Sequence, residues 1–176
     1  MKLLIGGSPS KKFHLEEFRR ALEGLGVQTK LVMDTEIYTG FPSRKISDWF
    51  QTKNKFERLI SDFKPDVILV DRQRHFAQIA SNSLIPLIIH LRGNIWEETK
   101  WARETTYNSF FKKIILQKWT DMATYTFQKS TLIIPICKYL EKIVKQHYPD
   151  KNTGVISSGI DASKWYQVKG MNLKHP

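Results

Sequence analysis

The sequence contains one cysteine, Cys137, among 176 residues, so an internal disulfide and a cysteine-rich zinc site are both excluded. The five histidines are scattered, and no two of them have the spacing of metal ligands on one helix. No apolar run approaches the roughly 20 residues that a membrane-spanning helix needs. We therefore expect a cytoplasmic protein without a metal.

The sequence also lacks the short motifs of self-contained enzymes. Gly6, Gly7 and Ser8 follow the first apolar run, but the spaced glycines of a dinucleotide fingerprint are missing. No glycine directly precedes Lys11 or Lys12, as a P-loop requires, and no Gly-x-Ser-x-Gly elbow of a hydrolase occurs. The sequence therefore names no catalytic residue, and it disfavours a stand-alone sugar-phosphate enzyme such as an epimerase.

Asp71 follows an apolar run, as the phosphorylated aspartate of response-regulator receivers does. Receivers bind magnesium with an acidic pair at the end of their first strand. Gly6 and Gly7 stand at that position here, so we reject the receiver interpretation.

The charge is strongly one-sided. Lysine and arginine number 28 against 17 acidic residues, which gives a formal net charge of +11 and a pI near 9.7. Such a surplus favours an anionic partner, which can be nucleic acid, anionic lipid or a phosphorylated substrate. A solvated basic surface explains the charge equally well.

Apolar runs of strand length alternate with segments of helical period along the chain. We expect a loop at 35–44, strands at 3–5, 29–33, 67–70, 86–91, 132–136 and 154–156, and helices at 14–25, 46–63, 75–83, 99–129 and 138–147, the fourth broken near Thr105. The strands are apolar throughout rather than alternating, which is typical of strands buried on both faces. The pattern predicts an α/β fold, a Rossmann-like parallel sheet of about six strands with helices on both faces.

The stretch from Lys129 to Trp165 predicts a strand, a helix, a turn and a strand, and it closes on Ile156-Ser157-Ser158-Gly159-Ile160-Asp161 followed by Trp165. This order and spacing resemble the end of the N-terminal domain in family 4 glycosyltransferases, whose closing block reads Ile-Pro-Asn-Gly-Val-Asp before an aromatic residue. Ser157 and Ser158 replace the proline and asparagine, and Cys137 replaces a serine. Upstream, residues 15–27 resemble the first helix of that family, and residues 89–94 resemble its fourth strand.

The resemblance implies a GT-B architecture of two Rossmann-like domains facing a cleft. Residues 1–166 would be the N-terminal, acceptor-binding domain, and residues 167–176 a linker toward a C-terminal domain that binds the nucleotide-sugar donor. The implied reaction moves a sugar to a glycan or lipid-linked acceptor with retention of configuration and without a cofactor or metal. We expect this part of the enzyme to be inactive alone.

Eight residues are candidates for substrate binding because they follow predicted strands or, for His90, lie near the end of one, where open α/β sheets bind ligands. They are Gly6, Gly7, Ser8, Arg72, His90, Arg92, Gly93 and Asn94. Other interpretations stay open: a tight turn for the glycines, a solvated loop for Arg72, a core position for His90, and an ion pair with Glu97 or Glu98 for Arg92.

Two further partners remain open. Lys112, Lys113 and Lys118 interleave with Phe110, Phe111, Ile114 and Trp119, a mixture typical of a helix on the inner, anionic face of a membrane. A core helix with a lysine-rich outer face would have the same sequence pattern. The alternative function is a non-catalytic basic Rossmann-like module that binds nucleic acid or another polyanion.

Overall fold

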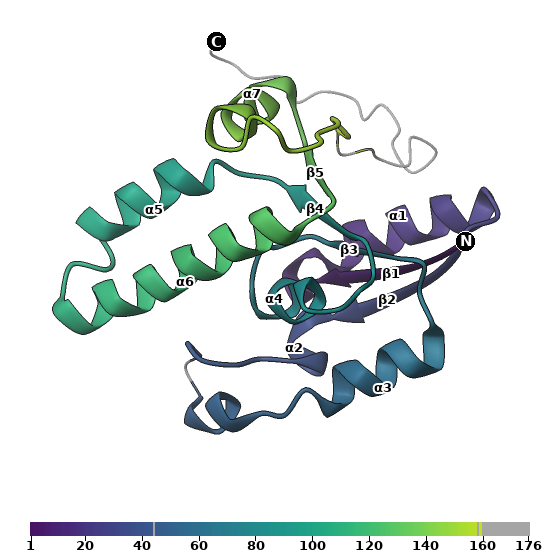
Figure 1. Ribbon diagram of the computed structural model, residues 1–176, viewed down its shortest axis with the longest axis horizontal. Helices are drawn as coiled ribbons and strands as arrows, with labels where there is room; N and C mark the ends of the chain where they lie inside the picture. Colours follow the sequence, from purple (N-terminus) through teal and green to yellow (C-terminus); the bar gives the residue numbers. More distant parts are fainter. Residues whose placement is uncertain (44, 158, 160–176) are drawn as a thin grey trace, which may run out of the picture.

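A computed structural model of the chain describes residues 1–43, 45–157 and 159 (Figure 1). Within these residues, five parallel strands form one sheet: β1 (Lys2–Gly7), β2 (Gln28–Met33), β3 (Val67–Val70), β4 (Leu87–Leu91) and β5 (Leu132–Pro135). Helices cover both faces. The predicted Rossmann-like α/β fold is therefore confirmed.

The strand order is β2-β1-β3-β4-β5. The chain runs outward from β1 to β2, then crosses back over β1 to β3 and continues in the opposite direction. This reversal lies between β1 and β3, and it leaves a crevice outside the carboxyl ends of those strands where ligands bind in open α/β sheets.

The sixth strand predicted at 154–156 is not formed within the described residues, so the expected six strands become five. A single bridge pairs Thr153 with Ile133. Two hydrogen bonds continue along β5, from Gly154 N to Ile133 O at 3.3 Å and from Ile156 N to Pro135 O at 3.1 Å. The segment therefore follows the edge of the sheet in parallel without forming a regular ladder.

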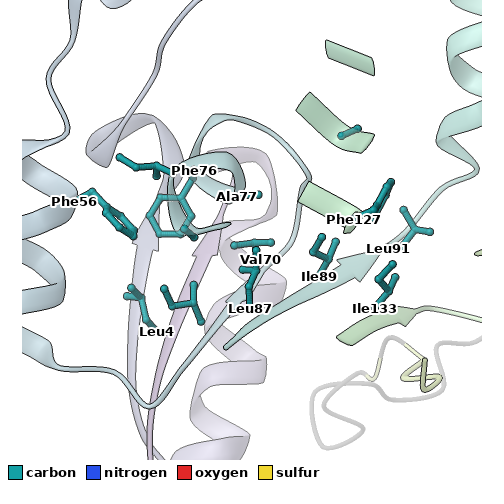
Figure 2. Packing of buried hydrophobic residues seen from close by; sticks show 14 of the residues in the cluster. Leu4, Phe56, Val70, Phe76, Ala77, Leu87, Ile89, Leu91, Phe127 and Ile133 are labelled. Atoms are coloured by element: carbon teal, nitrogen blue, oxygen red, sulfur yellow. The ribbon is translucent and has the colours of Figure 1, made fainter. Parts of the chain in front are cut away.

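The two faces of the sheet are covered unequally. α1 (Lys12–Gly24) packs Leu15 against Leu3, Ile5 and Leu69 on one face. The main core lies on the other face (Figure 2), where the sheet meets α3 (Asn54–Phe63), α4 (His75–Ser81), α6 (Phe110–Lys129) and α7 (Lys138–His147). Phe56, Phe76 and Phe127 are its largest buried side chains from the helices.

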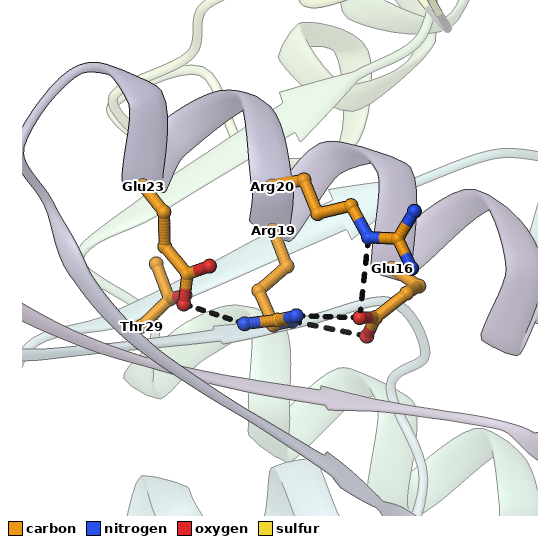
Figure 3. A network of polar contacts seen from close by, with 5 residues as sticks. All are labelled: Glu16, Arg19, Arg20, Glu23 and Thr29. Atoms are coloured by element: carbon orange, nitrogen blue, oxygen red, sulfur yellow. Dashed lines mark hydrogen bonds and ion pairs between the residues drawn. The ribbon is translucent and has the colours of Figure 1, made fainter.

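Arg19 anchors α1 beside β2 in a polar network on the surface (Figure 3). Its guanidinium pairs with Glu16 and Glu23 one turn away on either side, each at 2.5 Å. Glu23 also accepts a hydrogen bond from the Thr29 hydroxyl at 2.8 Å. The ion pairs lie within α1, and the hydrogen bond between Glu23 and Thr29 links the end of the helix to the edge strand β2.

The remaining elements are short, and several of them have other bounds than the sequence predicted. The helix expected at 46–63 is divided into the 3₁₀ helix η2 (Ile46–Phe50) and α3, because the apolar Ile46 and Phe50 stay exposed instead of packing. The loop expected at 35–44 contains the short helix α2 (Asp34–Ile37), and η1 (Pro9–Lys11) precedes α1. α7 has the bounds predicted from its period.

The long helical region becomes an antiparallel hairpin of α5 (Ile95–Glu104) and α6, with the expected break at 105–109. In Figure 1 the two helices run side by side, and the turn between them lies away from the sheet. The start of α5 follows β4 and therefore lies at the carboxyl edge of the sheet, where the hairpin borders the candidate site.

Candidate functional site

A cavity of about 410 Å³ lies outside the carboxyl ends of β3 and β4. The chain after β3 forms one side of it, the start of α5 forms another, and the middle of α6 closes it. Its polar and charged lining residues are Lys11, Asp71, Arg72, Gln73, Arg74, Arg92, Glu98, Thr99, Tyr107 and Trp119. We call it the cationic cavity, because four lysine and arginine side chains face two carboxylates.

Two of these cations are available to a ligand. Within the part of the chain that the structure describes, no carboxylate forms an ion pair with Lys11 or Arg72. Arg74 instead lies over the ring of Trp119, with its guanidinium carbon 4.6 Å from the ring centroid. Guanidinium groups match the oxygens of phosphates and carboxylates with paired hydrogen bonds, so the cavity suits an anionic group.

Asp71 is the buried centre of the cavity's polar wall. Its side chain is fully buried, and Oδ1 accepts hydrogen bonds from Arg92 Nε and from His90 Nδ1, the latter at 3.3 Å. Burial raises the pKa of Asp71, but the hydrogen bonds and charges of His90 and Arg92 outweigh it and hold the pKa below its usual value. The carboxylate is therefore ionised and orients Arg92.

One oxygen of that carboxylate has no partner. Oδ2 of Asp71 is buried and accepts no hydrogen bond from any residue that the structure describes. A buried carboxylate oxygen without a donor is costly, so Asp71 is held in its place at an energetic expense that the pairing of Oδ1 offsets.

The first turn of α5 also faces the cavity, through Gly93 and Ile95. Asn94 is the N-cap, and its side-chain oxygen accepts from the backbone N–H of Glu97 at 3.3 Å. The backbone N–H groups of Ile95 and Glu98 are hydrogen-bonded to the carbonyl oxygens of Gly93 and Asn94. The turn therefore contributes the positive end of the helix dipole to the cavity, and the carboxylates of Glu97 and Glu98 in the same turn offset part of it.

A second cavity, of about 610 Å³, lies between α1 and the sheet on the less covered face. Its apolar lining comes from Leu15, Phe18, Leu69, Ile134 and Ile156, and we call it the apolar cavity. Arg92 lines both cavities, while His90 lines only this one. The cluster of Asp71, His90 and Arg92 therefore stands between the two.

The described part of the glycosyltransferase-like closing block borders the apolar cavity. Ile156, Ser157 and Gly159 line it, and the backbone of Ile156 is hydrogen-bonded beside the end of β5. The block lies at the ligand-binding edge of the sheet up to that point. Ser158, Ile160, Asp161 and Trp165 lie outside the described residues.

Four of the eight predicted site residues line one or both of the two cavities, and the other four line neither. Arg72, Arg92 and Gly93 line the cationic cavity, and His90 and Arg92 line the apolar one. Gly6, Gly7, Ser8 and Asn94 line neither. Ser8 is buried beside Ser10, with 3.0 Å between their hydroxyl oxygens, and Asn94 caps α5.

Side chains fill the space around the two glycines. A Cβ on Gly6 would overlap the ring of Phe76, and one on Gly7 would overlap Leu15. The missing side chains therefore let α4 and α1 approach β1 closely, which gives both glycines a packing role.

Arg92 forms its ion pair with Asp71. The alternative considered from the sequence was an ion pair with Glu97 or Glu98.

Sequence reasoning missed Asp71 and Lys11 as site residues. Asp71 was considered only for a receiver-type magnesium site, although its position directly after a buried strand was a usable signal. Lys11 ends η1, between the end of β1 and the start of α1. Its approach to the loops after β3 and β4 follows from the strand order, which the sequence pattern does not contain.

The described residues contain neither a metal-binding cluster nor a membrane-spanning helix. Among the described residues, no cluster of three or more His, Cys, Asp or Glu side chains is arranged to hold a metal ion. Over the same residues, no helix combines the length and the apolar character that crossing a bilayer requires.

No protein-family model matches the chain, and no curated protein matches it significantly. Among solved structures, UGT73P12 of Glycyrrhiza uralensis, in complex with glycyrrhetinic acid 3-O-monoglucuronide, aligns with 85% of this chain at 11% identity and a TM-score of 0.45. The chain spans 41% of the length of that protein. At this identity and TM-score, the likeness carries no argument about activity.

Proposed function

We propose that the chain is the acceptor-side domain of a retaining, nucleotide-sugar-dependent glycosyltransferase of the two-domain GT-B type. The cationic cavity holds a phosphate group of one of its substrates, either the donor's pyrophosphate or a phosphate on the acceptor. A second domain binds the rest of the nucleotide sugar. The observation that carries the proposal is the cavity at the carboxyl edge of the sheet, where two unpaired cations and a helix N-terminus converge.

Different residues of the cationic cavity bind and orient the ligand. Lys11 and Arg72 pair with phosphate oxygens. Asp71 holds Arg92 through Nε, which leaves the two terminal nitrogens of that guanidinium for the ligand.

The resemblance of the closing block supports the same reading from the sequence. Its described part lies at the edge where ligands bind in this class of fold, beside the apolar cavity. That cavity would receive the acceptor's less polar part. No side chain of this chain is assigned to bond making or breaking, and the domain alone is expected to bind without turnover.

A second candidate is a polyanion-binding module, which the net charge of +11 favours. Such a module binds oligonucleotides with a steep dependence on salt, because each phosphate contact releases counterions. The cationic cavity, with about 410 Å³, has the size of a small-molecule site. This second candidate is therefore supported by the net charge and not by the cavity.

Titration of the chain with four probes tests the proposal: glucose, glucose 1-phosphate, UDP-glucose and a single-stranded oligonucleotide. Amide chemical shifts report the position of each. We expect saturable binding of the two phosphorylated sugars, with shifts confined to Arg72, Gly93 and Ile95 and their neighbours, and no binding of glucose. Binding of the oligonucleotide alone, with shifts spread over the surface lysines, would support the polyanion-binding module instead.

A further inference from the structure

Four large apolar side chains are exposed around the turn of the α5–α6 hairpin. Trp101 near the end of α5 is 64% exposed, and Phe110, Phe111 and Ile114 at the start of α6 are 74%, 77% and 41% exposed. The rings of Phe110 and Phe111 contact each other edge to face, with centroids 5.7 Å apart. We call these four residues the hairpin tip.

The hairpin tip is not part of the core. The helix α6 buries its side chains only from Leu116 onward, through Met122, Ala123 and Phe127. The alternative of a core helix with a lysine-rich outer face therefore does not hold for Phe111, because the first turn of α6 lies beyond the sheet (Figure 1). Adjacent exposed aromatic rings on a projecting element typically mark a contact surface.

The charges beside the hairpin tip have one sign. Lys100, Arg103, Lys112, Lys113 and Lys118 are all exposed, and Glu104 is the single carboxylate residue in the sequence between residues 99 and 119. A second copy of this chain would bring the same cations against one another. An anionic surface that also accepts aromatic rings is complementary on both counts.

We infer that the hairpin tip docks the protein on an anionic lipid bilayer, with Phe110 and Phe111 entering the headgroup layer and the lysines contacting lipid phosphates. This surface is separate from the proposed sugar site, and its test does not depend on that proposal. The hairpin nevertheless connects the two, since Thr99, Ala102, Leu116 and Trp119 line the cationic cavity. Docking would therefore hold the cavity beside the headgroups, where a lipid-borne phosphate is reachable.

Flotation with vesicles tests the inference. The chain is mixed with vesicles of phosphatidylcholine alone or with 30 mol% phosphatidylglycerol, a composition of about one anionic lipid in three. We expect binding to the anionic vesicles only, and loss of most of it at high salt because charges contribute. The double substitutions Phe110→Ser with Phe111→Ser, and Lys112→Glu with Lys113→Glu, should each weaken binding about tenfold or more.

Matched controls separate the hairpin tip from the rest of the basic surface. Phe50→Ser removes an aromatic side chain that is 80% exposed on η2, and Lys53→Glu with Lys142→Glu changes the net charge as much as the lysine pair does. Both controls should bind as the wild type does. Fluorescence gives an independent readout: the blue shift on binding should shrink in Trp101→Phe, because that indole lies at the hairpin tip.

Three outcomes would overturn the inference. The first is equal binding to neutral and anionic vesicles. The second is equal weakening by Lys53→Glu with Lys142→Glu, which would indicate a diffuse charge effect. The third is a concentration-dependent dimer in gel filtration that Phe110→Ser with Phe111→Ser abolishes while vesicles are not bound, which would assign the hairpin tip to self-association.

Discussion

Arg92 donates through Nε to the buried carboxylate of Asp71, and the two residues follow the neighbouring strands β4 and β3. The contact joins two loops at the carboxyl edge of the sheet and fixes a guanidinium between the cationic and the apolar cavity. Asp71 therefore has two consequences that can be measured separately, one for stability and one for the geometry of the site.

Replacement of Asp71 by asparagine should destabilise the fold by about 1–3 kcal/mol, because it removes the charge that Arg92 and His90 face in a buried setting. Urea unfolding at pH 7 measures the change. Asp62→Asn on the exposed side of α3 is the matched control and should stay near the wild type. If Asp71→Asn lowered the free energy of unfolding no more than Asp62→Asn does, the contact between Asp71 and Arg92 would make no net contribution to stability.

The carboxylate of Asp71 should also make the free energy of unfolding decrease at acidic pH. The pKa of Asp71 is lowered in the fold from its usual value of 3.8, so its contribution to stability is fully present above that value and is lost as pH falls through the lower folded pKa. Comparing unfolding free energies of wild type and Asp71→Asn between pH 5 and pH 2, a range of about three units, should show the two curves converging at the acid end.

His75 should produce a second pH dependence at milder acidity. Its side chain is buried between Tyr38 and Trp119, and burial, with a smaller effect of Arg74, lowers the pKa of the imidazole from 6.5. The unfolded chain binds the proton more readily, so stability should fall as pH drops below 6.5. Urea midpoints at pH 7.5 and 5.5, about one unit on either side, should differ less in His75→Gln than in His14→Gln.

Gly6→Ala should destabilise the fold by about 1–3 kcal/mol, since the added methyl overlaps the ring of Phe76 inside the main core. Gly24→Ala is the control: nothing lies near its added methyl, and alanine favours a helix over glycine by up to about 1 kcal/mol. The double substitution of Gly6→Ala with Phe76→Leu should recover part of the loss. Recovery of stability in the double variant would identify the clash with Phe76 as the cause. If Gly6→Ala and the double variant were destabilised equally, the cause would lie in the backbone instead.

Most of the fold could be predicted from apolar spacing alone. Continuous runs such as Val67–Val70 can be buried only between helices on both faces, and the period of Lys138–His147 gives the bounds of α7. The prediction was wrong where apolar residues do not pack. Ile46 and Phe50 follow a helical period but lie exposed, so no tertiary contact extends α3 back to them.

The site was harder to predict because its contacts depend on strand order. Arg72 and Arg92 could be proposed from their positions after strands, and both line the cationic cavity. The pairing of Arg92 with Asp71 requires β3 and β4 to be neighbours, and the approach of Lys11 requires β1 beside β3. Periodicity in one sequence reports burial and says nothing about which strands are adjacent.

Calorimetric titration of inorganic pyrophosphate into the wild type and Arg72→Ala at one fixed ionic strength tests the cationic cavity most directly. Arg72 has no ion-pair partner among the described residues, so its removal should leave the fold intact, and Arg58→Ala on α3 is the matched control. We expect saturable binding in the wild type and Arg58→Ala, weakened about tenfold or more in Arg72→Ala. Equal binding by all three proteins would contradict a phosphate site in this cavity.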